Sequence, residues 1–158
     1  MNSRILFFLP LLLVFTTATL HAQAKLAIYG TVGGEKGVTQ SWGTAGTLGM
    51  YLGVSGAGPL ALAADVRGDF SSNLKSILAG PRLAISPPVF PLKPYAELLI
   101  GGSSVDKGST QFAARYVLGV DTTILPRVDW RVIDFSESIN KISNVHTKTL
   151  TTGLVVRF

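Results

Sequence analysis

The chain has 158 residues, of which 47% are hydrophobic, only 15% are charged and 17 are glycine. A water-soluble domain typically carries about a quarter charged residues, so this composition excludes an ordinary water-facing surface. There is no cysteine, which excludes a disulfide framework. The net charge is +5, but the basic residues lack the clustering that a nucleic-acid-binding surface requires.

The first 24 residues have the pattern of a cleavable signal peptide. Arg4 supplies a short positive region, Ile5 to Phe15 form an apolar run, and Ala22-Gln23-Ala24 place small residues at the spacing that signal peptidase accepts. The apolar run is shorter than the ~20 residues that a membrane-spanning helix needs. We therefore expect residues 1–24 to be removed, with cleavage after Ala24 or Ala22, and residues 25–158 to form a single domain.

The remainder of the chain shows the two-residue hydrophobic period of β-strands. The uncharged stretch 42–64 is long enough for a membrane helix, but its glycines and the turn Gly56-Ala57-Gly58-Pro59 favour two strands. An even number of strands, each spanning ~9–11 residues, is typical of single-chain bacterial membrane barrels. The pattern predicts eight strands, at residues 25–34, 43–55, 59–70, 76–86, 93–103, 110–123, 127–137 and 147–158.

The connections between these strands alternate in character. Residues 56–58, 87–92 and 124–126 form short turns, whereas the other connections are longer and more polar, at 35–42, 71–75, 104–109 and 138–146. Membrane barrels have short turns on the periplasmic side and longer loops outside. If the mature amino terminus starts in the periplasm, the polar set faces outward.

The two faces of each strand differ in a way that favours a membrane barrel. In the strand 110–123, for example, Phe112, Ala114, Tyr116, Leu118 and Val120 alternate with Ala113, Arg115, Val117, Gly119 and Asp121. Small residues with sparse charges suit the narrow lumen of an eight-stranded barrel, so the uniformly apolar faces are expected to contact lipid. The fold class that we predict is therefore all-β, an eight-stranded antiparallel up-and-down transmembrane β-barrel preceded by a cleavable signal peptide.

Three strand positions do not follow this pattern simply. Pro81 lies inside a strand, where it removes a ladder hydrogen bond, so a bulge is expected near Gly80-Pro81. By simple alternation, Asp134 would face lipid. Either a bulge reverses the alternation, or Asp134 lies at the level of the lipid headgroups. The strand 25–34 could face either way.

Four charged residues on successive strands share the inward parity: Asp65, Arg82, Glu97 and Arg115. If each connection is symmetric about its centre, Asp65 faces Arg82, Arg82 faces Glu97, and Glu97 faces Arg115, with a register uncertain by about two residues. Opposite charges on facing strands attract, and side chains fill a lumen only eight strands wide. The sequence therefore predicts a lumen plugged by a charge ladder.

The carboxy terminus carries the most specific pattern. Thr151 and Gly153 precede alternating hydrophobic residues, including Val156, that end on Phe158. This pattern matches the terminal strand that bacterial outer-membrane β-barrels use as their assembly signal. Together with the segments Gly80-Pro81-Arg82, Pro94-Tyr95-Ala96-Glu97 and Gly119-Val120-Asp121, it makes the mature chain resemble small eight-stranded outer-membrane barrels, in the broad class of OmpA-type transmembrane domains and OmpX-like barrels.

The resemblance implies a location in the cell outer membrane, with insertion by the outer-membrane assembly machinery and delivery by periplasmic chaperones. It implies no single activity, because one fold hosts many functions. We expect a monomer surrounded by outer-membrane lipid and lipopolysaccharide, whose anionic groups suit the basic surface. No nucleic acid, cofactor or metal is expected.

Three classes of function remain. The first is a non-catalytic envelope protein with a structural or surface-contact role and a charge-plugged lumen. The second is a narrow channel for ions or small solutes. The third is a lipid-modifying enzyme, in which His146, the single histidine after the signal peptide, would combine with Ser136 or Ser138 and Glu137. No local motif supports the third class, so we do not expect an enzyme.

Overall fold

The computed structural model describes residues 25–37, 41–71, 74–105, 110–140 and 145–158. The predicted signal peptide at 1–24 and parts of the four polar connections lie outside these residues. Eight strands follow one another along the chain: β1 (Leu26–Lys36), β2 (Gly43–Ala57), β3 (Leu60–Ser71), β4 (Leu74–Ile85), β5 (Leu92–Val105), β6 (Gln111–Leu125), β7 (Val128–Asn140) and β8 (Val145–Arg157). Their ends lie within three residues of the predicted ones.

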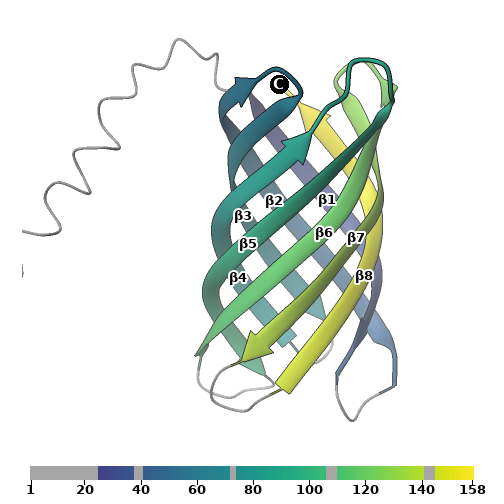
Figure 1. Ribbon diagram of the computed structural model, residues 1–158. Helices are drawn as coiled ribbons and strands as arrows, with labels where there is room; N and C mark the ends of the chain where they lie inside the picture. The colour runs from purple at the N-terminus through teal and green to yellow at the C-terminus, as the bar shows by residue number, and fades with distance from the viewer. Residues whose placement is uncertain (1–24, 38–40, 72–73, 106–109, 141–144) are drawn as a thin grey trace, which may run out of the picture.

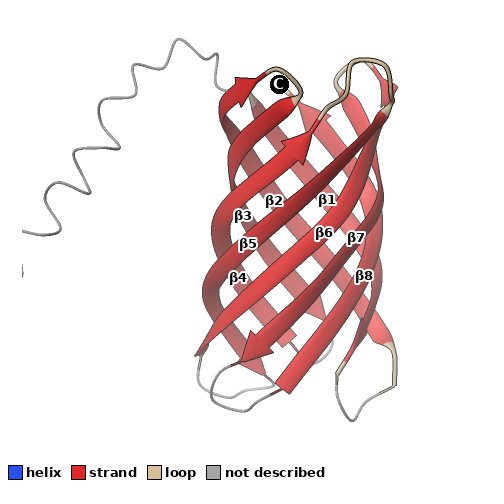
Figure 2. Ribbon diagram, viewed as in Figure 1, coloured by secondary structure: helices blue, strands red, loops and turns tan. Residues whose placement is uncertain are grey.

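The strands form one closed antiparallel barrel in chain order, with β8 paired to β1 (Figures 1 and 2). The predicted fold class is thereby confirmed. Closure matters because every strand then has a hydrogen-bonding neighbour on both sides and no sheet edge remains open. Figure 1 shows the carboxy terminus at the same end of the barrel as the short turns. Within the described residues, no helix is long and apolar enough to cross a membrane.

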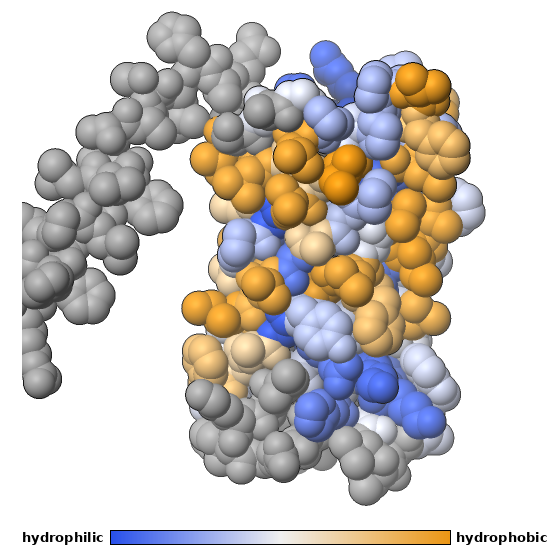
Figure 3. All heavy atoms as spheres, in the orientation of Figure 1, coloured by the Kyte–Doolittle hydropathy of each residue, from blue (hydrophilic) through white to orange (hydrophobic). Residues whose placement is uncertain are grey.

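The outer surface of the barrel is apolar over most of its height. Leu and Ile side chains on every second residue point outward; Ile77 is 71% exposed and Leu98 is 67% exposed. Figure 3 shows this apolar surface as orange patches over most of the height of the face in view, with paler and blue residues between them; we call it the apolar belt. Exposed large apolar residues on this scale are unfavourable in water, so the belt fits the hydrocarbon of a membrane. In β1, Ile28 and Val32 point outward, which settles the facing of this strand.

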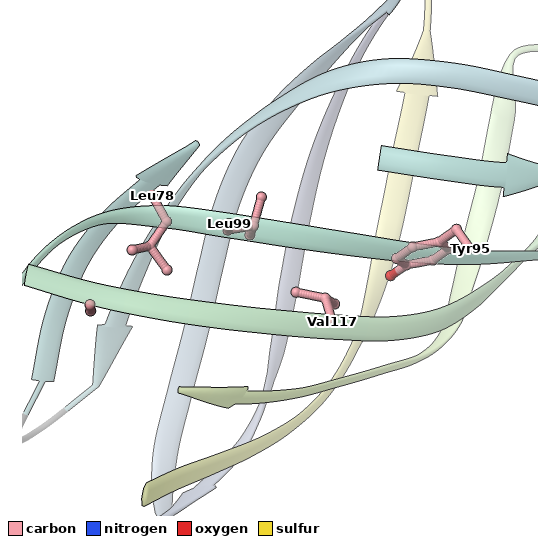
Figure 4. Close-up of a cluster of buried hydrophobic side chains, with 5 residues drawn as sticks. Leu78, Tyr95, Leu99 and Val117 are labelled. Carbon is pink, nitrogen blue, oxygen red and sulfur yellow. The ribbon is translucent and has the colours of Figure 1, made fainter. Parts of the chain in front are cut away.

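The inner surface holds a small apolar cluster beside many polar groups. Leu78 on β4, Tyr95 and Leu99 on β5, and Ala113 and Val117 on β6 pack together inside the barrel (Figure 4). This cluster covers one wall of the lumen. The side chains that face it from the other strands are mostly charged or hydroxylated.

Within the described strands the register shifts on β2 between Gly53 and Ser55, on β6 between Thr123 and Leu125, and on β7, but not at Pro81. Pro81 interrupts the pairing of β4 with β5, but Ala79–Ile100 and Arg82–Glu97 keep the same register on either side, so the expected bulge near Pro81 is wrong. Proline costs one ladder bond there, and its ring lies on the exposed outer face, where it fits without a shift of the strand. The irregularity that affects the lumen charges lies on β7, where the register with both neighbouring strands shifts between Arg131 and Asp134.

The first testable prediction concerns closure. Because a closed barrel satisfies all its backbone groups internally, it resists detergent until it is heated. Unheated and boiled samples of the mature protein are expected to migrate differently on SDS gels, with a β-type circular dichroism spectrum. Identical migration together with a helical spectrum would contradict the barrel.

Candidate functional site

The bulge on β7 decides which charges enter the lumen. Residues usually alternate between the two faces of a strand, but the extra residue in a bulge reverses the alternation beyond it. Arg131 and Asp134, three positions apart, therefore both point inward, and both are buried. Asp134 thus lies neither against lipid nor at the headgroup level.

Six buried side chains form a closed ring of alternating charge near the middle of the lumen, which we call the lumen ring. Each is at most 3% exposed. The ring runs Arg67, Glu97, Arg82, Asp121, Arg131 and Asp134, and Asp134 returns to Arg67. It draws on β3, β4, β5, β6 and β7, and its formal charge is zero, with three arginines and three acids.

The contacts in the lumen ring range from short charge-assisted hydrogen bonds to longer ion pairs. Arg82 donates to Glu97 through one nitrogen and to Asp121 through the other, at 2.8 Å. Arg131 donates from Nε to Asp121 at 3.0 Å and from Nη1 to Asp134 at 3.3 Å. Arg67 joins Asp134 at 3.2 Å and Glu97 at 3.5 Å. Each of the six groups contacts two partners of opposite charge, which offsets the high cost of removing an ion from water.

Two tyrosines lie between the guanidinium groups of the lumen ring. The Tyr95 ring centre is 3.6 Å from Cζ of Arg82 and 4.7 Å from that of Arg131, and the Tyr29 ring centre is 4.1 Å from Cζ of Arg131. These are cation–π distances. The Tyr95 hydroxyl also donates to Asp134 at 2.7 Å, and the Tyr29 hydroxyl donates to Asp65 at 2.8 Å. Aromatic rings thus fill the space between the charges.

Both tyrosines lie over a glycine on the neighbouring strand. Tyr29 pairs with Gly49, and Tyr95 pairs with Gly119. A Cβ atom at either glycine would overlap the tyrosine ring. The two pairs are four strands apart in a closed barrel of eight, so they lie on opposite walls. Glycine at these two positions therefore lets each ring lie flat against its wall and reach the guanidinium groups.

A second polar group lies nearer the polar connections. Asp69 accepts hydrogen bonds from Arg115 at 2.6 Å, Thr47 at 2.7 Å and Ser76 at 2.8 Å. Arg67 is 3.4 Å from Asp69 and joins this group to the lumen ring. Contacts between buried charged groups thus run continuously from Arg115 through Asp69 and Arg67 into the lumen ring.

The four residues of the predicted charge ladder are all buried inside the barrel, but only part of the ladder forms. Arg82 faces Glu97 in register and binds it. The expected Asp65–Arg82 and Glu97–Arg115 contacts are wrong, because Asp65 pairs with Gly80, and Arg115 pairs with Leu99. These registers are two residues from the expected ones, since the two connections are not centred where symmetry placed them. Arg115 reaches Asp69 on β3 instead.

Sequence reasoning missed most of the lumen ring. Arg67 shares the inward parity of Asp65, and Asp121 shares that of Arg115, so alternation in the sequence predicts that both face the lumen. Arg131 and Asp134 could not both be placed inward by alternation, since the bulge that does so has no marker such as glycine or proline in the segment 131–134. The ring therefore depends on a backbone irregularity that is not visible in the residue pattern.

The proposed catalytic combination around His146 does not form. Glu137 accepts a hydrogen bond from Tyr116, and His146 Nδ1 is 3.0 Å from Glu137 Oε1, on the outer face of the barrel. Ser136 and Ser138 flank Glu137 on β7, and both are buried on the lumen face. These hydroxyls and the imidazole lie on opposite faces of the barrel wall, so neither serine is placed to act with His146 as a nucleophile.

The residues of the terminal motif line the seam between β8 and β1. A Cβ atom at Gly153 would overlap the backbone of Gly30 and Thr31, so only glycine lets the strands approach this closely. Thr151 points into the lumen, whereas Val156 and Phe158 point outward. The Phe158 N–H donates to the Leu26 carbonyl at 2.8 Å and adds the last hydrogen bond of the seam.

Comparison with solved structures finds barrels of the same kind. Neisserial surface protein A (NspA) superposes with a TM-score of 0.58 at 19% identity, covering 85% of this chain and 97% of that chain. The outer membrane enzyme PagL superposes with a TM-score of 0.55 at 13% identity, covering 82% of this chain and 98% of that chain. Ail, the attachment invasion locus protein of Yersinia pestis, superposes with a TM-score of 0.50 at 15% identity, covering 85% of this chain and 99% of that chain.

These similarities establish the fold as that of small outer-membrane β-barrels. No protein-family model matches the chain, and no curated protein matches it in sequence. Membership of the OmpA-type or OmpX-like class is not shown. The three neighbours include a surface protein, an enzyme and an attachment protein, so the shared fold alone does not choose among functions.

The second prediction tests the tyrosine–glycine pairs. In a Gly119→Ala variant, the new methyl group meets a Tyr95 ring that is held by Arg82 and Arg131, so the ring must leave its position. We expect a loss of about 1–3 kcal/mol in the free energy of unfolding, measured by urea titration in lipid vesicles. Gly53→Ala is the matched control, because a Cβ there meets nothing closer than 3.6 Å. Equal stability of both variants would contradict the packing role of Gly119.

Proposed function

We propose that this protein is a non-catalytic integral protein of the cell outer membrane, with an envelope-structural or surface-contact role and a plugged lumen. The observation that carries the proposal is the lumen ring, whose side chains cross the barrel and are almost completely buried. An open pore would leave such charges hydrated. Export through a Sec-type signal peptide and insertion by the outer-membrane assembly machinery, aided by periplasmic chaperones, belong to the same proposal.

The surface-contact part rests on a polar patch on the outer face of the barrel. Tyr116, Glu137 and His146 are linked there, and the exposed side chains of Lys148 and Lys36 lie close by, on neighbouring strands. In Figure 3, hydrophilic colour gathers below the apolar belt, toward the polar connections. Basic groups at the edge of an apolar belt suit the anionic headgroups of lipopolysaccharide. Among the neighbours, Ail was solved with the sulfated heparin analogue sucrose octasulfate.

The alternative is a narrow channel for ions or small solutes. One observation favours it: the lumen contains a cavity between the lumen ring and the end that carries the short turns. In a channel, the lumen ring would be the gate. The closure of the lumen ring and the burial of its side chains support a plugged lumen over a channel. A conductance measurement in planar bilayers distinguishes the two.

The third prediction is that wild-type protein in planar bilayers shows little or no steady conductance, whereas Arg82→Ser raises it. Removing Arg82 takes away the side chain between Glu97 and Asp121 and leaves two acids without that partner. The new current should therefore favour cations. Lys148→Ser, on the outer face, is the control and should stay silent. Large, stable openings of the unmodified protein would overturn the plugged lumen and support the channel.

The fourth prediction separates assembly from stability. Phe158 is 66% exposed and contributes one backbone hydrogen bond to the seam, worth about 0.5–1.5 kcal/mol. Deleting Phe158 should lower the amount of inserted protein in cells strongly, while the thermal stability of protein refolded in detergent falls only slightly. Membrane fractionation and thermal melts measure the two effects. Normal insertion of the deletion variant would remove the support for an assembly signal.

A further inference from the structure

A cavity of about 630 Å³ occupies the lumen at the end that carries the short turns and the carboxy terminus, and we call it the terminal vestibule. Its lining reaches from Gly56, Ser86 and Arg157, near the strand ends, to Arg82 and Asp121 of the lumen ring. The vestibule is therefore a chamber closed at its inner end by the lumen ring. Its volume lies within the range of small-molecule binding sites.

The walls of the terminal vestibule are small and apolar. At its inward positions the strands carry alanine or glycine: Ala27, Gly53, Ala61, Ala63 and Ala84. Short side chains leave the space that larger ones fill at the level of the lumen ring. The ring of Tyr51 adds an aromatic surface on one side, where it stacks near Arg82 at 4.5 Å. An organic molecule would find apolar contact on several sides.

The charges that line the terminal vestibule are unbalanced. Four basic residues face two acids: Lys25, Arg82, Lys93 and Arg157 against Asp121 and Asp129. Both acids are already engaged. Asp121 accepts from Arg82 and Arg131, and Asp129 accepts from Lys93 at 3.1 Å and Arg157 at 3.0 Å. The lining therefore carries an excess of two positive charges that its own acids do not balance.

Several donors of the terminal vestibule lack a protein acceptor. Within the described residues, neither the Lys25 ammonium nor the Tyr51 hydroxyl makes a hydrogen bond, and the buried Nε of Arg157 has no partner. Lys25 and Arg157 are close to each other, because Arg157 pairs with Ala27 across the seam of β1 and β8. Two basic groups thus flank the mouth of an apolar chamber on the same side.

We propose that the terminal vestibule binds a small organic anion with an apolar body. Its carboxylate or sulfonate group accepts hydrogen bonds from Lys25 and Arg157, and its hydrocarbon packs against Ala63, Ala84 and Tyr51. A charge-assisted hydrogen bond is about twice as strong as a neutral one, so charge decides which molecules are retained. The lumen ring stays closed, so the ligand enters and leaves by the same mouth. The site is independent of the outer polar patch.

The experiment titrates mature protein in lipid nanodiscs with benzenesulfonate and, separately, with neutral benzenesulfonamide. Backbone amide shifts of Gly53, Ala63 and Ala84, followed by NMR, report on the terminal vestibule and are insensitive to probe dissolved in the lipid. We expect benzenesulfonate to shift these amides in a saturable manner, with an affinity at least about tenfold higher than that of benzenesulfonamide. Equal affinities, or shifts confined to lipid-facing residues, would overturn the proposal.

Two variants locate the site. Lys25→Gln removes a charge at the mouth and should weaken benzenesulfonate binding about tenfold without altering the weak binding of benzenesulfonamide. Ala63→Leu fills the chamber and should weaken both probes. Lys148→Gln, at the opposite end and on the outer face, is the matched control and should bind like the wild type. Heat-dependent migration on SDS gels verifies that each variant is folded. Unchanged binding in both site variants would overturn the proposal.

Discussion

The structure depends on one constraint: most of the charge that is buried in the narrow lumen must find partners of opposite charge. Moving an unpaired ion out of water costs several kcal/mol, and breaking a buried pair by removing one partner costs about 3–5 kcal/mol. The lumen ring meets this constraint by closure, since each arginine binds two acids and each acid binds two arginines. A linear ladder would leave a half-satisfied group at each end. In the ring, every charged group has two partners of opposite charge, although Nε of Arg67 makes no hydrogen bond.

Closure of the ring in turn requires the bulge on β7, and two glycines make room for the tyrosines that pack against the ring. The bulge between Arg131 and Asp134 supplies two inward charges from one strand three residues apart. Gly49 and Gly119 allow Tyr29 and Tyr95 to lie flat from opposite walls, which brings aromatic faces against the guanidinium groups. The bulge is a local departure from regular alternation, and the two glycines lie in regular register with their tyrosines. Each is explained by the ring rather than by the contact with lipid.

The sequence predicts the parts of the fold that follow from periodicity and not those that follow from packing. Strand number and inward parity come from alternation, whereas the up-and-down order is implied by the resemblance to small outer-membrane barrels. Asp65, Arg82, Glu97 and Arg115 are correctly assigned to the lumen by their parity. Contacts between side chains across the lumen cannot be derived from alternation. A shift of one residue in the assumed centre of a connection moves the register of the two strands that it joins by two residues. The bulge on β7 has no proline or glycine to mark it, so Arg131 and Asp134 were missed as a pair.

Buried ion pairs are costly compared with apolar packing, so their retention in this lumen calls for a physical reason. A barrel with apolar residues on both faces would have no preference for which face meets lipid, and a one-residue slip of a strand would exchange the faces at little cost. Charges such as Arg67 and Asp134 remove this ambiguity, because turning either toward hydrocarbon would leave an unpaired ion in lipid. The lumen ring therefore fixes the facing of the strands that carry it. The short side chains of Ala63 and Ala84 line the terminal vestibule and leave its space open, so the facing of their strands depends on the charges of the lumen ring.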